Sequence, residues 1–150
     1  MGFLKFLLSG KYQDDLIFSL EDIGSALRNS AYKIKFIAPI DDGNKTYQRV
    51  SIIDGALNVT VTRHGKFISF SELYKLKQKF NFDDMQQWNF SKNFASYIPF
   101  INSNHAMLRH DMLIEHGIPK ETFLHFLATW RDLDQEFQKH CNVTAQDRVS

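Results

Sequence analysis

The chain has 150 residues, of which 43% are hydrophobic and 14% aromatic, and its 18 basic and 17 acidic residues give a formal net charge of +1. This length and apolar content suffice for the core of one domain, and they exclude an intrinsically disordered chain. Because the two signs of charge are interspersed, no long-range field attracts phosphate backbones, so nucleic acid is not an expected partner. We interpret Lys75, Lys77 and Lys79 as one solvated face of an element.

Residues 1–15 are predicted to be an apolar N-terminal extension. Their run FLKFLL is interrupted by Lys5 and is too short to span a bilayer. The extension lacks the cleavage site of a secretory signal, and Phe6 stands where a myristoylation signal has Ser or Thr. The single cysteine, Cys141, cannot form an intramolecular disulfide, which suits a reducing compartment. We therefore predict a cytoplasmic protein with no membrane span, whose extension packs on its own body in preference to a partner or a membrane surface.

The first half of the chain predicts one helix followed by four strands. Ser19 is a candidate N-cap, and apolar residues recur at helical spacing from there to Asn29. Alternating and β-branched patterns then predict strands, with turns at 41–44, 54–55 and 63–66. The predicted strands span residues 32–37, 47–53, 57–62 and 67–70.

The second half predicts a short helix over 83–88, strands over 95–101 and 106–113, and a long final helix. The two strands are joined by the turn Asn102-Ser103-Asn104. Pro119 is placed at the first helical position of the last helix, which carries one apolar stripe. The stripe consists of Phe123, Phe126, Leu127, Trp130, Leu133 and Phe137. Residues 142–150 are polar and lack periodicity, so we expect this tail to fray.

This order of elements predicts an α+β fold with one domain over residues 16–141. An antiparallel sheet of about five to six strands is flanked by an N-terminal helix and a long C-terminal helix. The helices are expected to cover one face of the sheet. The other face is then left to solvent or to a partner.

Three histidines raise the question of a metal site, because His105, His110 and His116 fall within twelve residues. His105 and His110 are an odd number of positions apart and so face opposite sides of a strand, while His116 follows in a turn. The adjacent acids Asp83 and Asp84 are interpreted as first-turn residues of a helix, where they complement its dipole. We therefore expect no metal at these positions.

Signatures of catalysis are missing from the sequence. It has no Gly-rich phosphate loop, no nucleophile elbow and no HExxH helix. His140 and Cys141 are adjacent, but neighbouring residues on a helix point about 100° apart. We therefore expect no catalytic residue and no cofactor, and we interpret the protein as a non-enzyme.

Three segments resemble the YbjN family of bacterial proteins: DMQQWNFSKNFASY at 84–97, LRHDMLIEHGI at 108–118 and FLATWRDLDQEF at 126–137. The resemblance covers roughly residues 16–141, tightly after Asp84 and loosely before it. The chain departs from the family at Gln86, where Asn is usual, and at 102–104, where an acidic turn with Gly is usual. The matching signature residues are Trp88, Asn89, Phe94, Tyr97, Asp111, Gly117, Trp130 and Phe137.

The resemblance implies a fold similar to type III secretion chaperones and the label of a sensory transduction regulator, which describes no demonstrated chemistry. It suggests a chaperone-like or regulatory module that binds an unidentified protein partner, through an exposed apolar face or a strand edge, and that forms a homodimer. The alternative is a regulator that senses a small molecule between sheet and helix. From the residues themselves we expect a structural signature, in which aromatic side chains anchor helices on the sheet and Asn89 caps or turns the main chain at a helix end.

Overall fold

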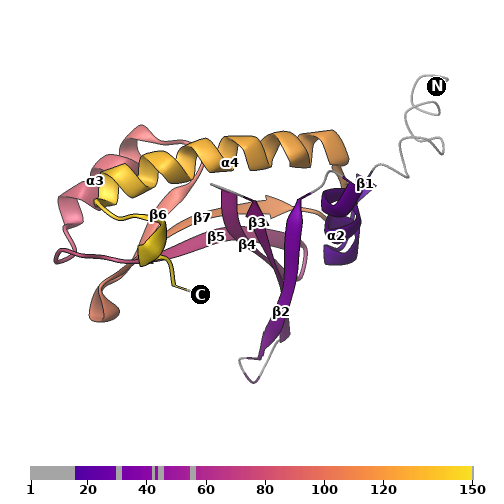
Figure 1. The fold of residues 1–150 in the computed structure, drawn as a ribbon, viewed down its shortest axis with the longest axis horizontal. Helices are drawn as coiled ribbons and strands as arrows, with labels where there is room; N and C mark the ends of the chain where they lie inside the picture. The colour runs from indigo at the N-terminus through magenta and orange to yellow at the C-terminus, as the bar shows by residue number, and fades with distance from the viewer. Residues whose placement is uncertain (1–15, 30–31, 42, 44–45, 55–56, 150) are drawn as a thin grey trace.

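A computed structural model describes residues 16–29, 32–41, 43, 46–54 and 57–149, so the predicted extension 1–15 lies outside the described residues. Figure 1 shows a long helix, α4, lying across a sheet, with α2 near one end of that helix and α3 near the other. The described elements are β1 (Leu16–Ile17), α2 (Leu20–Asn29), β2 (Lys33–Asp41), β3 (Thr46–Asp54), β4 (Leu57–His64), β5 (Phe67–Lys75), α3 (Phe82–Ser91), β6 (Ser96–Phe100), the 3-10 turn η1 (Ile101–Ser103), β7 (His105–Leu113), β8 (Ile118–Pro119), α4 (Lys120–Cys141) and the 3-10 turn η2 (Ala145–Asp147).

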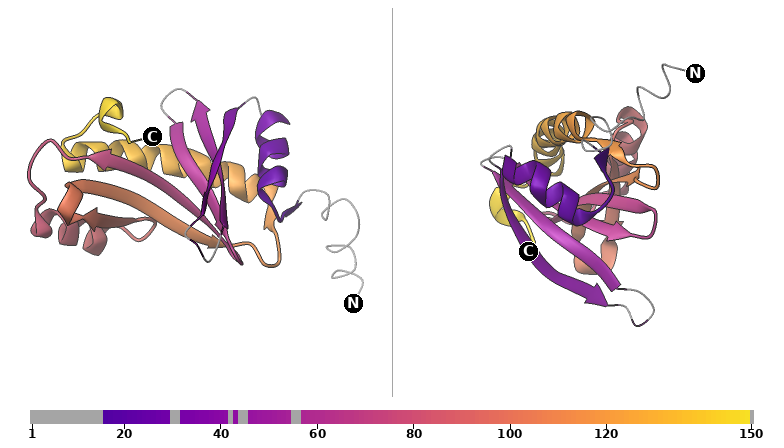
Figure 2. Two further views of the ribbon diagram at one scale, coloured as in Figure 1. Left: turned by 90° about the horizontal axis from the view of Figure 1, so that it is seen from below. Right: turned by 90° about the vertical axis from the view of Figure 1, so that its right-hand side faces the viewer.

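In the described part of the chain, six strands form one antiparallel sheet in the order β2-β3-β4-β5-β7-β6. The predicted α+β class, with an N-terminal helix and a long C-terminal helix, is confirmed. Figure 2 shows that β2, β3 and β4 are turned steeply relative to β5, β7 and β6. This twist bends the sheet around its core and hollows the side away from α4.

The helix ends follow the predicted signals. The main-chain N–H of Asp22 donates to Ser19 Oγ, and the N–H of Ser19 donates to Asp22 Oδ2, each at 3.1 Å, which closes a capping box at α2. Asn81 caps α3 by accepting from the main-chain N–H of Asp83, and Asp83 and Asp84 occupy the first turn as expected. Helix α4 begins one residue after Pro119, because that proline still pairs with β1.

The core lies between the sheet and the helices. Alternate residues of the central strands, including Val50, Val61 and Phe70, are fully buried on this side. The Phe70 ring lies 4.3 Å from the Phe126 ring of α4, centroid to centroid, and 6.4 Å from that of Trp130. Burial of large aromatic side chains of this kind contributes roughly 1.5–3 kcal/mol each, so the aromatic stripe of α4 is a principal source of stability.

The structure differs from the sequence predictions in its connections. Strand β2 runs to Asp41 and not 37, because a bulge between Ile37 and Ile40 lets the strand continue past Pro39. Strand β5 runs to Lys75 because it has β7 as a partner along its whole length. The two-residue strands β1 and β8, which pair with each other, were not predicted, since pairs this short carry no periodic signal.

The expectation that the polar tail frays is wrong for residues 142–149, here called the C-terminal segment. Its Val143 side chain is buried, and the N–H of Val149 donates to Leu73 O at 2.8 Å. Arg148 forms a bridge with Tyr74 on β5, beyond the point where β4 has turned away. The segment is ordered because Arg148 has partners inside the fold, which its local composition does not reveal.

Candidate functional site

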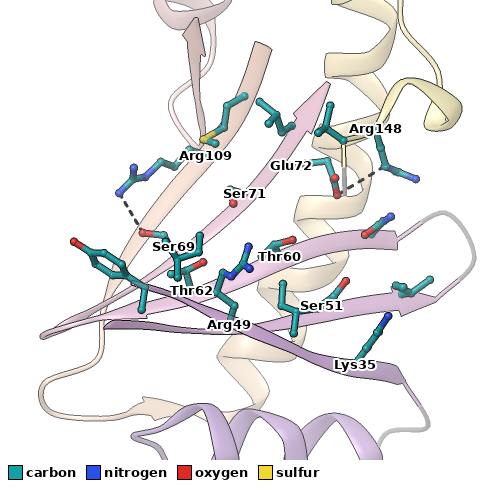
Figure 3. Close-up of a pocket in the computed structure, with 18 of the residues that line it drawn as sticks. Lys35, Arg49, Ser51, Thr60, Thr62, Ser69, Ser71, Glu72, Arg109 and Arg148 are labelled. Carbon is teal, nitrogen blue, oxygen red and sulfur yellow. Dashed lines mark hydrogen bonds and ion pairs between the residues drawn. The ribbon is translucent and has the colours of Figure 1, made fainter. Parts of the chain in front are cut away.

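The face of the sheet opposite α4, here called the open face, carries no helix in the described part of the chain. It is hollowed into a groove of about 720 Å³ whose lining residues come from β2, β3, β4, β5, β7 and the C-terminal segment. Figure 3 shows these side chains standing on the strands with the C-terminal segment at one end. The groove is therefore formed by alternate residues of the same strands that build the core with their other face.

Hydroxyl groups cover the middle of the groove, and apolar side chains lie around them. The hydroxyl residues are Ser51, Thr60, Thr62, Ser69 and Ser71. The apolar residues are Ile37, Ile40, Ile53, Leu73, Met107 and Val149. Such a mixed surface can hold polar main-chain groups and small apolar side chains together, which is what an extended peptide presents.

Positive charge is concentrated in the groove. Its basic lining residues are Lys35, Arg49, Arg109 and Arg148, and among the described lining residues only Glu72 has a carboxylate. Arg49 donates to the carbonyl oxygen of Ala38 at 2.7 and 3.1 Å, and no carboxylate of the described residues forms an ion pair with it. Arg109 is paired with Asp111 and Arg148 with Asp134, so the positive charge without an internal partner in this groove is that of Lys35 and Arg49.

A cluster of polar side chains links three strands beside the groove. His64 Nε2 lies within hydrogen-bonding distance of Ser69 Oγ, which donates to Asp111 Oδ1 at 2.5 Å. Arg109 Nε donates to the same carboxylate oxygen at 2.9 Å. Partial burial opposes ionisation, but the hydrogen bonds from Arg109 and Ser69 outweigh it and hold the pKa of Asp111 below its ordinary value.

This cluster has the residue types of a serine hydrolase but not their arrangement. In a triad the histidine lies between serine and acid, whereas here Ser69 lies between His64 and Asp111 and gives its proton to the acid. The main chain of Ser69 pairs with Thr62 on β4 and with Asp111 on β7. The main-chain N–H groups around Ser69 therefore belong to the sheet and are not available to form an oxyanion hole. The cluster therefore cross-links β4, β5 and β7.

A second polar cluster lies buried at the end of the groove under α4. Asp134 Oδ1 accepts from the Tyr74 hydroxyl at 2.5 Å, and its Oδ2 accepts from Arg148 at 2.8 Å and from Gln138 at 3.1 Å. Burial, together with the hydrogen bond to Asp134, raises the pKa of Tyr74 well above its usual range. This cluster attaches the C-terminal segment to both α4 and β5.

Glu72 shares Arg148 with Asp134 but is placed less favourably. Its Oε2 lies 3.7 Å from Arg148 Nε, beyond hydrogen-bonding distance, and has no hydrogen-bond partner among the described residues. Burial raises the pKa of Glu72 to about 8, against a lowering by Arg148 and with a further raising by the charge of Asp134. The ion-pair distance alone would suggest an ionised carboxylate, but desolvation dominates, so Glu72 is mainly neutral near pH 7.

Both outer edges of the sheet are protected against pairing with another strand. On β6 the Asn89 side chain accepts from the Tyr97 N–H at 2.7 Å and donates to the Tyr97 carbonyl at 3.0 Å, and Pro99 has no N–H to offer. On β2 the edge carries lysines, a proline and the bulge. A partner strand is therefore easier to accommodate on the open face than at an edge.

The signature residues of the α3–β6 region lie together as structural elements. Trp88 is buried, donates from Nε1 to Ala95 O at 3.0 Å and packs edge-on against Phe137. Tyr97 packs against the same Phe137 ring with centroids 5.1 Å apart. Asn89 binds main chain as expected, but it binds β6 and not its own helix end.

The remaining signature residues are distributed over the core, the open face and a turn. Phe94 stacks on His110 with ring centroids 4.8 Å apart. Trp130 is fully buried, and its indole N–H has no hydrogen-bond partner among the described residues. Asp111 lies in the cluster beside the groove, and Gly117 adopts a φ of 82° close to Phe18. The structure therefore brings Asp111 alone among them to the candidate site.

The histidines considered as metal ligands and the single cysteine lie on β7, in the turn after it and on α4. His105 and His110 lie on β7, and His116 lies in the turn that follows. In the part of the chain that the structure describes, no three His, Cys, Asp or Glu side chains are grouped to hold a metal ion. Burial raises the pKa of the Cys141 thiol to about 12, which makes it a poor nucleophile.

Most groove residues were not singled out from the sequence. Each belongs to an alternating strand pattern, and the polar half of such a pattern is ordinarily read as solvent-facing. The available signal was the concentration of Ser and Thr with Lys and Arg on those polar positions. Only the register of the strands shows that these positions share one concave face.

Comparison of the chain with protein-family models, with curated proteins and with solved structures gave no match. Among the described residues no helix is both long and apolar enough to cross a membrane.

Proposed function

We propose that this protein is a non-catalytic binding module that holds a segment of a partner protein on its open face. The observation that carries the proposal is the contrast between the two faces of one sheet. The inner face is packed under α4, whereas the outer face is hollowed into a groove that no described helix covers. An antiparallel sheet can leave this second face to solvent or to a partner, and a concave face that carries both hydroxyl and apolar side chains suits an extended partner segment.

The resemblance to the YbjN family supports the same proposal. It implies a chaperone-like or regulatory role for a cytoplasmic protein that binds a protein partner. The protected edges of β2 and β6 favour binding on the face over binding by strand addition. A homodimer is part of the proposal, and the solution mass measures it directly.

A photo-crosslinking experiment tests the site. A photoreactive amino acid is placed at Thr60, in the middle of the groove, and in a second variant at the exposed Gln135 of α4. Both variants are expressed in cells that naturally produce the protein, and the cells are irradiated. The proteins crosslinked to each variant are then identified by mass spectrometry. We expect one crosslinked protein from Thr60 that Gln135 does not give. Equal products from both positions, or none from Thr60, contradict the proposal.

A second candidate function, the sensing of a small molecule, is favoured by the groove volume, which falls within the usual range for ligand pockets. Its expected location between sheet and helix is not supported, because the aromatic side chains there pack on one another. A ligand at a hundredfold over its dissociation constant stabilises by roughly 2.7 kcal/mol, so thermal-shift screening detects it. Stabilisation by one compound that Thr60→Trp abolishes would favour sensing over protein binding.

A further inference from the structure

The charge of the groove indicates the chemistry of its occupant. Lys35 and Arg49 lie on the neighbouring strands β2 and β3 and face the groove. Lys35 is opposite Ser51, and Arg49 is opposite Ile37 in the next pair on the same face. No carboxylate lies within ion-pair distance of either one among the described residues. Two adjacent basic side chains without an internal counter-charge are placed to meet acids from outside.

The other end of the groove carries two further guanidinium groups. Arg109 is held by Asp111, and Arg148 by Asp134, so both are fixed in position before a ligand arrives. The Arg109 side chain is 36% exposed, whereas that of Arg148 is 13% exposed and lies beside Glu72 at the margin of the groove (Figure 3). Fixed guanidinium groups bind carboxylates at a lower entropic cost than mobile ones.

The polar and apolar lining between these charges fits an extended peptide. Thr60, Thr62 and Ser71 offer hydroxyls to main-chain groups, while Ile53, Leu73 and Met107 offer apolar contacts. At one end of the groove Arg148 and Val149 pair edge to edge with β5, where β4 no longer does, so this contact closes that end of the groove and does not lie on its face.

Aromatic rings are scarce on the same surface, which argues against single-stranded nucleic acid. Sheets that bind RNA present exposed aromatic side chains on which bases stack. In this groove the central positions are hydroxyl residues, and aromatic rings gather at one side, where His64 packs edge to face on Tyr47 and stacks on the exposed Phe67. The described aromatic rings thus lie at the margin, and the centre of the groove between Lys35, Arg49 and Ser71 carries none.

We propose that the groove binds an extended acidic segment of a partner protein, in which acidic residues are interspersed with small apolar ones. The proposal rests on the proposed function and specifies the partner's chemistry. Carboxylates of the segment meet Lys35 and Arg49 at one end and Arg109 at the other. Its apolar side chains contact Ile53, and its main chain binds the threonine hydroxyls.

Fluorescence anisotropy with the full chain tests the proposal. The probe is a labelled ten-residue peptide that alternates Glu and Val, and the matched probes carry Gln or Lys in place of Glu. We expect the Glu peptide to bind at least about tenfold more tightly than the Gln peptide, and the Lys peptide more weakly still. Equal binding of the Glu and Gln peptides would overturn the proposal.

Two variants locate the binding. The double change Lys35→Gln with Arg49→Gln is expected to weaken binding of the Glu peptide by about tenfold, because it removes both basic groups that lack a counter-charge. Lys139→Gln, at an exposed position of α4 on the other side of the molecule, is expected to change nothing. Circular dichroism confirms that both variants fold. Unchanged binding by the double variant would also overturn the proposal.

Further probes separate this proposal from its neighbours. A labelled single-stranded RNA that binds more tightly than the Glu peptide would overturn the proposal in favour of nucleic acid. Full competition by millimolar inorganic phosphate would also overturn it, because the groove would then be a simple anion site.

The crosslink at Thr60 distinguishes failure of the acidic chemistry from failure of the proposed function. A groove-specific partner without acidic segments leaves the proposed function standing and overturns only the acidic chemistry, whereas no groove-specific partner overturns the proposed function.

Discussion

Glu72 gives the sharpest test of the electrostatics at the buried end of the groove. Its pKa rises from 4.5 to about 8, chiefly through burial. Because the folded pKa lies above the unfolded one, the folded state keeps a proton that the unfolded chain loses. The resulting stabilisation is fully present below about pH 4.5 and is lost as the pH rises through about 8. The wild-type protein is therefore expected to lose stability across this window.

Replacing Glu72 with Gln removes the titration and keeps the size of the side chain. Each pH unit within the window contributes at most about 1.4 kcal/mol to the difference in the free energy of unfolding between the two proteins. Relaxation around the charge reduces this, so we expect Glu72→Gln to gain about 2–4 kcal/mol relative to wild type between pH 5 and pH 8. Urea unfolding followed by circular dichroism at pH 5, 6, 7, 8 and 9 measures it.

A matched control is Glu121→Gln, at an exposed position in the first turn of α4, which reports the effect of the same change at the surface. The reasoning fails if the difference between wild type and Glu72→Gln stays constant from pH 5 to pH 9. In that case Glu72 is ionised throughout and paired with Arg148 at 3.7 Å. The groove would then hold a fixed negative charge beside its arginines.

Three further changes test other contacts by thermal and urea unfolding. Arg148→Ala leaves a buried carboxylate of α4 without its cation and should cost about 3 kcal/mol; a loss below about 1 kcal/mol would show that the C-terminal segment is not held in this way. Asn89→Ala removes two hydrogen bonds to the β6 main chain and should cost about 1–2 kcal/mol, whereas the exposed Asn93→Ala should stay within about 0.5 kcal/mol. Gly117→Ala places a Cβ at a φ of 82° and at 2.9 Å from the Phe18 ring, and it should cost about 2–3 kcal/mol of stability. Gly65→Ala, where φ is 60° and the space is open, should cost about 1 kcal/mol. Equal costs at the two glycines would mean that the ring simply moves aside.

The elements of the fold were largely predictable because their signals are local. The apolar stripe of α4 and the alternation in β3 and β7 each follow from the period of one element. The cap of α2 at Ser19 and the acidic first turn of α3 at Asp83 and Asp84 were predictable for the same reason, since each acts within one turn, whereas Asn81 was not recognised as the cap of α3. What these patterns cannot give is the pairing of distant segments, such as β1 with β8.

The groove and the C-terminal segment illustrate the limit of local signals. Arg148 meets Asp134, Tyr74 and Glu72, which lie 14, 74 and 76 residues away in the sequence (148 − 134, 148 − 74 and 148 − 72). No periodicity connects such positions. The basic residues of the groove likewise share a face only through the order of strands. Asp111 was singled out, yet its contacts with Ser69 and Arg109 depend on the β5–β7 register.

The nearly neutral net charge and the basic groove together define how an acidic partner would be bound. With a net charge of +1, the chain exerts little attraction at long range, and at physiological salt the field of the groove is screened beyond about 8 Å. Electrostatic steering therefore contributes little to the rate of encounter, and the basic residues act only once the segment lies in the groove. Added salt should then lower the association rate of the Glu peptide only modestly and change its dissociation rate still less, because charges in contact are screened least. An association rate that falls steeply with salt would instead indicate steering by charges beyond those of the described groove.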